Sequence, residues 1–121
     1  MDTRKMTGQR GEALAKAFLQ QKGWTILATN WRSRIGELDI VATAPDEPYL
    51  VIVEVRTKRN NTYGTAAESV NYRKQQKVRR LGLQYAQQHR LLHKPLRFDV
   101  VTVYLPPGSA KPEISHIIAA F

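Results

Sequence analysis

Residues 36–58 read GELDIVATAPDEPYLVIVEVRTK and decide the fold, because they have the pattern of two strands joined by a tight turn. Side chains at 36–43 alternate between two faces, as in a β-strand. The segment PDEP at 45–48 consists of turn-forming residues, and 49–58 starts as a buried apolar run and becomes alternately charged. We therefore predict a β-hairpin. One face of its first strand is expected to carry Leu38, Ile40 and Ala42, and the other Glu37, Asp39 and Val41.

The register of this hairpin brings two acidic residues together. With the turn centred within 45–48, Asp39 lies directly across from Glu54, and directly opposed side chains have Cβ atoms about 4.5–5.5 Å apart. Two carboxylates so close repel each other, and a divalent ion such as Mg²⁺ or Mn²⁺ would relieve that repulsion. Two alternatives remain: a bulge that shifts the register by one residue, or neutralisation of the pair by Arg56 or by a lysine from a helix. The same register pairs Glu37 with Arg56 and Val41 with Ile52.

Predicted burial sets Glu54 and Lys74 apart from ordinary surface charges. Glu54 follows the apolar run LVIV at 50–53, which is typical of a central strand, so its carboxylate is expected to emerge from the core. Lys74 falls on the apolar stripe of a helix predicted at 65–89 and should point toward the sheet. It would then either place a cation beside the two carboxylates or pack its stem and direct its ammonium into solvent. The stripe consists of Val70, Val78, Leu81 and Tyr85.

The rest of the chain supplies a helix before the hairpin and two strands after the second helix. Thr7 is expected to cap the first helix, which Gly23 ends, while 1–6 form a frayed basic tail. Trp31 falls in a polar connection at 30–34. This order, αβββαββ, predicts one α/β domain over 1–121 with helices packed on a mixed sheet. The predicted elements are helix 8–22, strands 24–29, 36–43 and 49–58, helix 65–89, and strands 97–104 and 113–118.

Composition narrows the classes of partner and of site. Nineteen Lys and Arg against ten Asp and Glu give a formal net charge of +9, which makes nucleic acid the leading partner; a merely basic or ribosome-associated protein is the alternative. Cysteine is absent, so a metal site would consist of carboxylates, carbonyls or histidine. The chain has no apolar run near the ~18–20 residues of a membrane span and no secretory signal at 1–11, so we expect a cytoplasmic protein without a membrane partner.

Together, these motifs resemble the PD-(D/E)XK nuclease superfamily, close to its Holliday-junction-resolvase-like branch. More narrowly, the chain resembles the YraN family of predicted endonucleases, and the order and spacing of the shared motifs cover nearly the whole chain. The matching segments are Gly11-Glu12, GELD at 36–39, VEVR at 53–56, Tyr63-Gly64, Lys74 and RFD at 97–99. The resemblance implies a restriction-endonuclease-like fold.

The resemblance also implies hydrolysis of phosphodiester bonds with the help of Mg²⁺ or Mn²⁺. Asp39, Glu54 and the backbone carbonyl of Val55 would hold the ion, and Glu12 would be an additional ligand or support one. The superfamily usually has a lysine two residues after the glutamate, and this chain has Arg56 there. Arginine stays protonated, although its planar group can clamp a phosphate.

A replacement for that missing ammonium is expected from Lys74, with Lys58 as a more distant candidate on the same strand face. If neither replaces it, the chain would be a noncatalytic nucleic-acid-binding module on a nuclease scaffold. Trp31 and Tyr63, which we place in loops, would stack on bases or anchor those loops. Asp99 is expected to pair with Arg97 or to support the cleft rather than to bind the metal.

The partners expected from the resemblance are DNA ahead of RNA, including branched or recombination intermediates. Relatives that resolve four-way junctions are dimers, so a homodimer is a further expectation. Eight basic residues flank the predicted cleft in sequence and would contact phosphates, although each alone could be an ordinary surface charge. They are Arg32, Arg34, Lys58, Arg59, Arg73, Lys77, Arg79 and Arg80.

Overall fold

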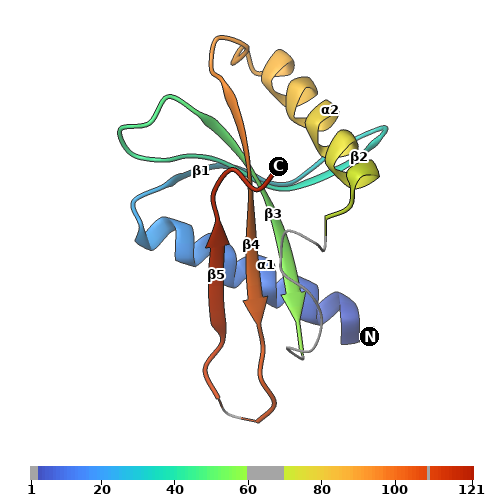
Figure 1. Ribbon diagram of the computed structural model, residues 1–121, viewed down its shortest axis with the longest axis vertical. Helices are drawn as coiled ribbons and strands as arrows, with labels where there is room; N and C mark the ends of the chain where they lie inside the picture. Colours follow the sequence, from blue (N-terminus) through green and yellow to red (C-terminus); the bar gives the residue numbers. More distant parts are fainter. Residues whose placement is uncertain (1–2, 60–69, 109) are drawn as a thin grey trace.

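A computed structural model describes residues 3–59, 70–108 and 110–121 (Figure 1). The order of its elements is αβββαββ, which confirms the order predicted from the sequence. The elements are α1 (Thr3–Gln21), β1 (Thr25–Ser33), β2 (Gly36–Thr43), β3 (Leu50–Lys58), α2 (Tyr72–Gln88), β4 (Leu96–Tyr104) and β5 (Glu113–Ile117).

The five strands form one mixed sheet in the order β1-β2-β3-β4-β5. The β3–β4 pair is parallel and the other three pairs are antiparallel. The chain crosses from β3 to β4 through α2, and α1 and α2 cover opposite faces of the sheet (Figure 1). This mixed α/β architecture confirms the predicted fold class and is compatible with a restriction-endonuclease-like fold.

Strand β3 is buried on both faces, as its apolar run predicts. Its odd-numbered side chains from 51 to 55 lie in the core beneath α1, together with Ala15 and Leu19. Leu50 and Ile52 lie on the opposite face, in the core that α2 covers. Because side chains alternate along a strand, Glu54 lies on the face toward α2.

Strands β2 and β3 separate halfway along their length. Their ladder has the predicted register and runs from Ala42 opposite Val51 to Ile40 opposite Val53. Beyond it, β2 continues to pair with β1 and β3 continues to pair with β4. The predicted pairing of Glu37 with Arg56 is therefore wrong, because Glu37 lies opposite Arg32 of β1. The sheet therefore forks one residue before the predicted pair Asp39–Glu54, and we call this place the fork.

The fork also changes the faces of β2. Ile40 and Ala42 pack in the core beneath α1, whereas Leu38 packs in the core beneath α2. The prediction that these three side chains share one face is therefore wrong for Leu38. The physical reason is that the end of β2 beyond Ile40 has left β3 and follows β1, so the alternation set by the β2–β3 ladder no longer holds there.

Helix α1 starts earlier than its expected cap at Thr7. It begins at Thr3, so Arg4 and Lys5 belong to its first turn and not to a frayed tail. Its end fits the prediction, because Gly23 follows with a φ of +86° and lets the chain turn away.

Helix α2 starts later than predicted. Asn71 caps it, since its side-chain oxygen accepts a hydrogen bond from the backbone nitrogen of Lys74 at 2.9 Å. Val70, predicted on the helical stripe, precedes the helix and packs against Val100. Residues 65–69 of the predicted helix and the predicted loop at 60–64, with Tyr63, lie outside the described residues.

Strand β1 is longer than predicted and extends through Ser33. The segment 30–34 is therefore mostly strand, and Trp31 lies in it opposite Leu38. The Trp31 ring packs edge-on against Tyr85 of α2, with ring centroids 5.5 Å apart. Trp31 thus anchors the β1–β2 arm to α2 and does not lie in a loop.

Candidate active site at the fork in the sheet

Asp39 is the first residue of β2 beyond the ladder with β3. Its Oδ2 accepts a hydrogen bond from the backbone nitrogen of Val55 at 2.9 Å. The side chain thereby provides the acceptor that a backbone carbonyl of β2 would otherwise supply. A strand residue directs its N–H and C=O to the same side, so we expect the carbonyl of Val55 to face the fork as well.

Glu54 brings a second carboxylate to the fork from β3. Its side chain is 4% exposed and lies within hydrogen-bonding reach of the Asp39 carboxyl. Burial and then the charge of Asp39 raise the pKa of Glu54 to about 7, although Lys74 and Arg56 oppose that rise. The close approach predicted for Asp39 and Glu54 is present in the structure.

The carboxyl of Asp39 also has a raised pKa, mainly because of burial. The hydrogen bond from Val55 and the charges of Lys74 and Arg56 act in the opposite direction. Both acids of the pair are thus held where their charged forms are disfavoured without a further cation nearby.

Lys74 lies on the side of the fork that α2 covers. Its Nζ is 3.8 Å from Oε2 of Glu54, so it points toward the sheet as predicted. The cap at Asn71 fixes the first turn of α2, in which Lys74 lies. A cation in the first turn of a helix is disfavoured by the helix dipole, and Glu54 offsets that effect.

Glu12 reaches the fork from the opposite face, on α1. Its neighbour Gly11 makes this approach possible, because a Cβ at Gly11 would lie 2.9 Å from the Cβ of Thr57 on β3 and would clash with the Thr57 hydroxyl. Burial and the charge of Asp39 raise the pKa of Glu12, and a hydrogen bond from Asn30 opposes this. The three carboxylates predicted to bind the metal, those of Glu12, Asp39 and Glu54, therefore all lie at the fork.

Two residues near the fork were given no functional role in the sequence analysis. Glu37 has a carboxylate oxygen that lies, with one each from Glu12 and Asp39, in a group whose members are within 4.8 Å of one another. Asn30 has a φ of +50° and, with its amide nitrogen turned inward, is 2.8 Å from Glu37 and 3.0 Å from Glu12. The signal for Glu37 was its place on the same predicted strand face as Asp39. The signal for Asn30 was strand-like alternation continuing past residue 29, which the expectation of a loop at 30–34 obscured.

The donor set at the fork fits a divalent cation. It consists of oxygen atoms alone, from carboxylates and one expected backbone carbonyl, which suits Mg²⁺ or Mn²⁺ better than softer metals. A cavity of about 180 Å³ on the α1 side is lined by Glu12, Asn30 and Asp39 and gives access from solvent.

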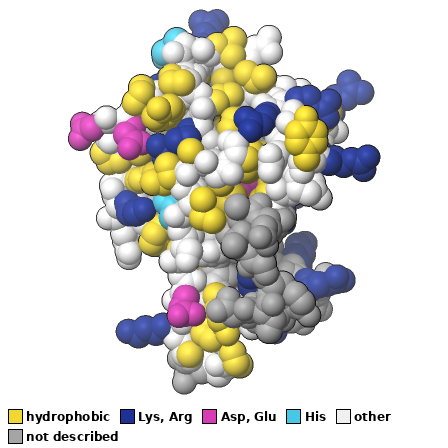
Figure 2. All heavy atoms as spheres, in the orientation of Figure 1, with side chains coloured by type: hydrophobic (Ala, Val, Ile, Leu, Met, Phe, Trp, Pro, Cys, Tyr) yellow, Lys and Arg dark blue, Asp and Glu magenta, His cyan; other side chains and the backbone are white. Residues whose placement is uncertain are grey.

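Basic residues lie on both sides of the fork. Arg56 is half-buried, and its charge acts on Asp39 and Glu54. Lys58 lies two residues further along β3, and Arg32 donates to Glu37 at 3.1 Å. Figure 2 shows Lys and Arg side chains gathered over α2, on the right of the view. The exposed members of the predicted set are Arg32, Arg34, Arg59, Arg73, Lys77 and Arg80.

Arg79 is placed differently from these exposed residues. Its guanidinium packs over the rings of Phe98 and Phe121, 5.2 and 5.5 Å from their centroids. This half-buried arginine contributes to the packing of α2 on the sheet, and the structure does not bring it to the fork.

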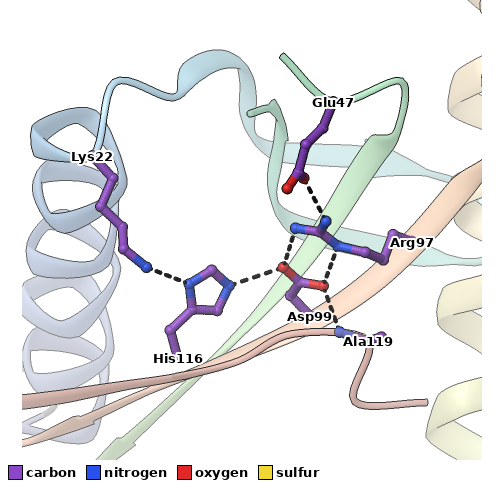
Figure 3. A network of polar contacts seen from close by, with 6 residues as sticks. All are labelled: Lys22, Glu47, Arg97, Asp99, His116 and Ala119. Atoms are coloured by element: carbon purple, nitrogen blue, oxygen red, sulfur yellow. Dashed lines mark hydrogen bonds and ion pairs between the residues drawn. The ribbon is translucent and has the colours of Figure 1, made fainter. Parts of the chain in front are cut away.

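Asp99 belongs to a separate buried network (Figure 3). Arg97 donates to both of its carboxylate oxygens at 3.0 Å, which confirms the predicted ion pair. His116 and the backbone nitrogen of Ala119 donate to it at 2.9 and 3.0 Å. Burial alone would raise the pKa of Asp99, but these bonds outweigh burial and leave the pKa below its ordinary value.

Lys22 and Glu47 complete this network, which we call the Asp99 network. Lys22 contacts Nδ1 of His116 at 3.1 Å, and Arg97 donates to Glu47 at 2.7 Å (Figure 3). A lysine can only donate, so Nδ1 is an acceptor and Nε2 carries the proton given to Asp99. The network joins the residue after α1, the hairpin turn, β4 and β5.

No helix in the described part of the chain combines the length and apolar character that crossing a membrane requires.

Comparison with known proteins places this sequence in a family. Residues 11–103 match the model of a family described as "Uncharacterised protein family UPF0102". A UPF0102 protein of Moorella thermoacetica is 46% identical over 119 residues, covering 98% of both chains. Relatives from Pelobacter propionicus and Nocardia farcinica are each 43% identical, covering 95% and 94% of this chain and 81% and 87% of their own. The chain therefore belongs to the UPF0102 family, which is the YraN family that its motifs resemble.

Proposed function

We propose that this protein is a nuclease that hydrolyses phosphodiester bonds of DNA with the help of Mg²⁺ or Mn²⁺. The observation that carries the proposal is the pair Asp39 and Glu54, two largely buried carboxylates held together at the fork with raised pKa values. A fold that only binds nucleic acid gains nothing from such a pair, because a negative charge repels phosphate. A bound divalent ion would turn this unfavourable arrangement into a favourable one.

The acidic residues of the fork would bind the ion. Asp39, Glu54 and the carbonyl of Val55 would hold the ion, with Glu12 as a further ligand. When bound, such an ion polarises a phosphoryl oxygen and lowers the pKa of a bound water. The hydrogen bond from Val55 fixes the orientation of Asp39 before any ion arrives, so little reorganisation accompanies binding.

Lys74 would supply the ammonium that the superfamily pattern has two residues after the glutamate. Its Nζ, beside Glu54, is in reach of a group bound at the fork and could orient the attacking water or donate to a phosphoryl oxygen. Arg56 stays protonated, so we assign it phosphate binding and charge compensation and not proton transfer.

The proposed substrate class follows from the charge and from the family resemblance. The net charge of +9 and the exposed arginines and lysines favour a polyanion. The preference for DNA over RNA, the branched intermediates, the homodimer and a cytoplasmic setting come from the resemblance and the sequence. These four remain proposals.

The alternative function is a noncatalytic nucleic-acid-binding module. The observation that favours it is Arg56, which stands where the superfamily has its lysine. The two functions differ in their need for the ion, since a binding module would hold DNA equally well without it.

A metal titration combined with a cleavage assay separates the two functions. Mn²⁺ binding is measured calorimetrically for the native protein, Asp39→Asn, Glu54→Gln and the control Glu113→Gln, which removes an exposed carboxylate from β5. Linear, flapped and four-way DNA are then incubated with each protein and Mg²⁺. We expect binding and cutting by the native protein and the control only. Metal-independent DNA binding without cutting would establish the binding module instead.

A further inference from the structure

A second cavity adjoins the fork on the α1 side. It has a volume of about 560 Å³ and lies between the first turns of α1 and the end of β3, which are side by side in Figure 1. Glu12 lines both this cavity and the smaller one that reaches Asp39, so both cavities border the carboxylates of Glu12, Glu37 and Asp39, which we call the acidic cluster. Its described lining residues include Arg4, Thr7, Gly8, Glu12, Arg56 and Arg59.

The charge of this cavity favours an anion. Three arginines, from α1 and β3 and the residue after β3, stand against the single carboxylate of Glu12 among its described lining residues. Arg59 is held in place because its Nε and Nη2 donate to the hydroxyl of Thr7 at 3.0 and 2.8 Å. Planar guanidinium groups bind phosphate through paired hydrogen bonds.

The charges at the start of α1 also favour a bound anion. The first turn of this helix carries Arg4 and Lys5, and it has no acidic residue within the described chain. Cations at the positive end of a helix dipole are unfavourable, whereas an anion bound there would be stabilised by both. A negatively charged ligand at this end of α1 would therefore offset the unfavourable placement of Arg4 and Lys5.

Gly8 provides an independent observation. It lies inside α1, where glycine weakens a helix relative to alanine. Packing against the described residues does not require it, because a Cβ at Gly8 would find none of their atoms within 4 Å, in contrast to Gly11, whose Cβ would clash with Thr57. A glycine in the lining of the cavity has no side chain to cover the backbone there, which allows a ligand to approach that backbone closely.

We propose that this cavity binds a phosphate group of the nucleic-acid strand that is cut at the fork. The inference rests on the proposed function, which it deepens by placing one phosphate of the strand beside the acidic cluster. Arg4 and Arg59 would bind the phosphate oxygens, and the exposed backbone at Gly8 would leave room for the sugar that follows. The strand would then enter on the α1 side and pass Glu12 to reach Asp39 and Glu54.

Binding of small probes in EDTA tests the pocket without the metal. The probes are thymidine 5′-phosphate, thymidine and inorganic phosphate, and their binding is followed by NMR shifts of amides in 3–12 and 55–59. We expect thymidine 5′-phosphate to bind about tenfold more tightly than thymidine, as the loss of a charge-assisted hydrogen bond implies. Equal binding of these two probes would overturn the proposal.

Gly8→Leu places a leucine side chain in the cavity, because Gly8 is one of its lining residues. The matched control is Ala17→Leu, which adds leucine at an exposed position further along α1. Leucine is a better helix former than glycine, so weaker binding would not come from loss of the helix. We expect Gly8→Leu to weaken thymidine 5′-phosphate about tenfold and the control to change it less than twofold. An unchanged affinity in Gly8→Leu would contradict the assignment.

A ten-nucleotide single strand distinguishes a strand phosphate from a free anion. The strand should displace thymidine 5′-phosphate in the native protein, while inorganic phosphate should displace it only at far higher concentration. Competition by inorganic phosphate at equal concentration would show a free-anion site and overturn the strand assignment. Failure of the nuclease proposal appears separately, as absence of Mn²⁺ binding at Asp39 and Glu54, which these measurements do not involve.

Discussion

The Oδ2 atom of Asp39 lies 2.9 Å from the backbone nitrogen of Val55, across the gap where β2 leaves β3. This contact lets two strands separate inside a sheet without leaving the Val55 N–H unsatisfied. It also gives Asp39 two roles, since the same carboxylate completes the fold at the fork and is the proposed ligand of the ion.

The two roles can be separated with two substitutions of Asp39. Asn keeps an acceptor oxygen for Val55 and removes the charge, whereas Ala removes both. We expect Asp39→Asn to retain the free energy of unfolding of the native protein or exceed it, and Asp39→Ala to lose about 1–3 kcal/mol, the penalty of an unsatisfied buried N–H. Urea unfolding without metal measures the free energy of unfolding of each variant. The Mn²⁺ affinity should fall in Asp39→Asn and in Asp39→Ala. Equal stability of the two variants would refute the structural role.

The raised pKa of Glu54 makes a prediction about stability and pH. A carboxyl group whose pKa rises from 4.5 to about 7 on folding binds more protons in the folded state between those values, so the free energy of unfolding falls as the pH rises through that range. Glutamine does not ionise, so in Glu54→Gln this fall in the free energy of unfolding is absent. At pH 8 and without metal, we expect the variant to be about 2–3 kcal/mol more stable than the native protein, and at pH 4 nearly equal to it.

Thermal or urea unfolding between pH 4 and pH 8 measures this difference. Glu113→Gln, at an exposed position of β5, serves as the control and should keep the native pH profile. Adding Mn²⁺ should reverse the order, because the native protein alone gains stability from the ion. A pH-independent difference between Glu54→Gln and the native protein would count against the raised pKa.

The sequence alone predicted the parts of the site that depend on local geometry. The turn at 45–48 sets the register of β2 and β3, so the approach of Asp39 to Glu54 followed from counting residues. The helical spacing likewise predicted that Lys74 points toward the sheet. Both relationships span a single turn or a single helix face.

The fork itself could not be predicted in this way. Beyond the β2–β3 ladder, the β1–β2 arm contacts α2 through Trp31 and Tyr85, while β3 stays paired with β4. Contacts between elements so far apart in the sequence leave no local pattern. Asn30 was assigned to a connection because its polar neighbours resemble loop residues. Its contact with Glu12 depends on α1 crossing the sheet, whereas its contact with Glu37 joins the paired strands β1 and β2.

Lys74 makes a prediction about the pH dependence of metal binding. Its charge lowers the pKa of Glu54, so Lys74→Ala should raise that pKa above about 7. The pH at which Mn²⁺ affinity reaches half its maximum should then move upward, because the ion binds the deprotonated carboxylate. Cleavage should fall more than DNA affinity, since only the reaction needs a cation at this place.

Two comparison variants show whether the charge itself is responsible. Lys74→Arg keeps the charge and should retain the native pH profile of metal binding. Arg73→Ala removes an exposed charge from the neighbouring position of α2 and should reduce DNA affinity without moving that profile. If Arg73→Ala shifted the pH profile of Mn²⁺ binding as much as Lys74→Ala does, the effect of Lys74 would come from the overall charge of α2 and not from its position beside Glu54.

The Asp99 network should affect stability and not metal binding. Asp99 is fully buried, and its lowered pKa means that its stabilisation is present above its ordinary pKa and lost as the pH falls below it. Asp99→Asn leaves Arg97 without its main partner, so we expect a loss of about 3–5 kcal/mol in the free energy of unfolding. Glu47→Gln, which changes the exposed end of the network, should cost less than about 1 kcal/mol.

Calorimetric Mn²⁺ titration of the folded Asp99→Asn protein checks the second half of this prediction. Its affinity should match that of the native protein, because Asp99 contacts Arg97, His116 and Ala119 and lies outside the fork. A substantial loss of Mn²⁺ affinity would instead give Asp99 the supporting role at the cleft that the sequence left open.

Two glycines on one face of α1 should respond in opposite ways to the same substitution. A Cβ at Gly8 would meet no atom of the described residues within 4 Å, so Gly8→Ala should raise the free energy of unfolding by about 0.5–1 kcal/mol through helix propensity. Gly11 contacts Thr57, so Gly11→Ala should lower it by about 1–3 kcal/mol, the usual cost of overpacking. Because α1 must then move away from β3, Glu12 should leave the acidic cluster and Mn²⁺ affinity should fall. Stabilisation by both substitutions would show that α1 does not lie against β3 as described, and with it the place of Glu12 at the fork would be lost.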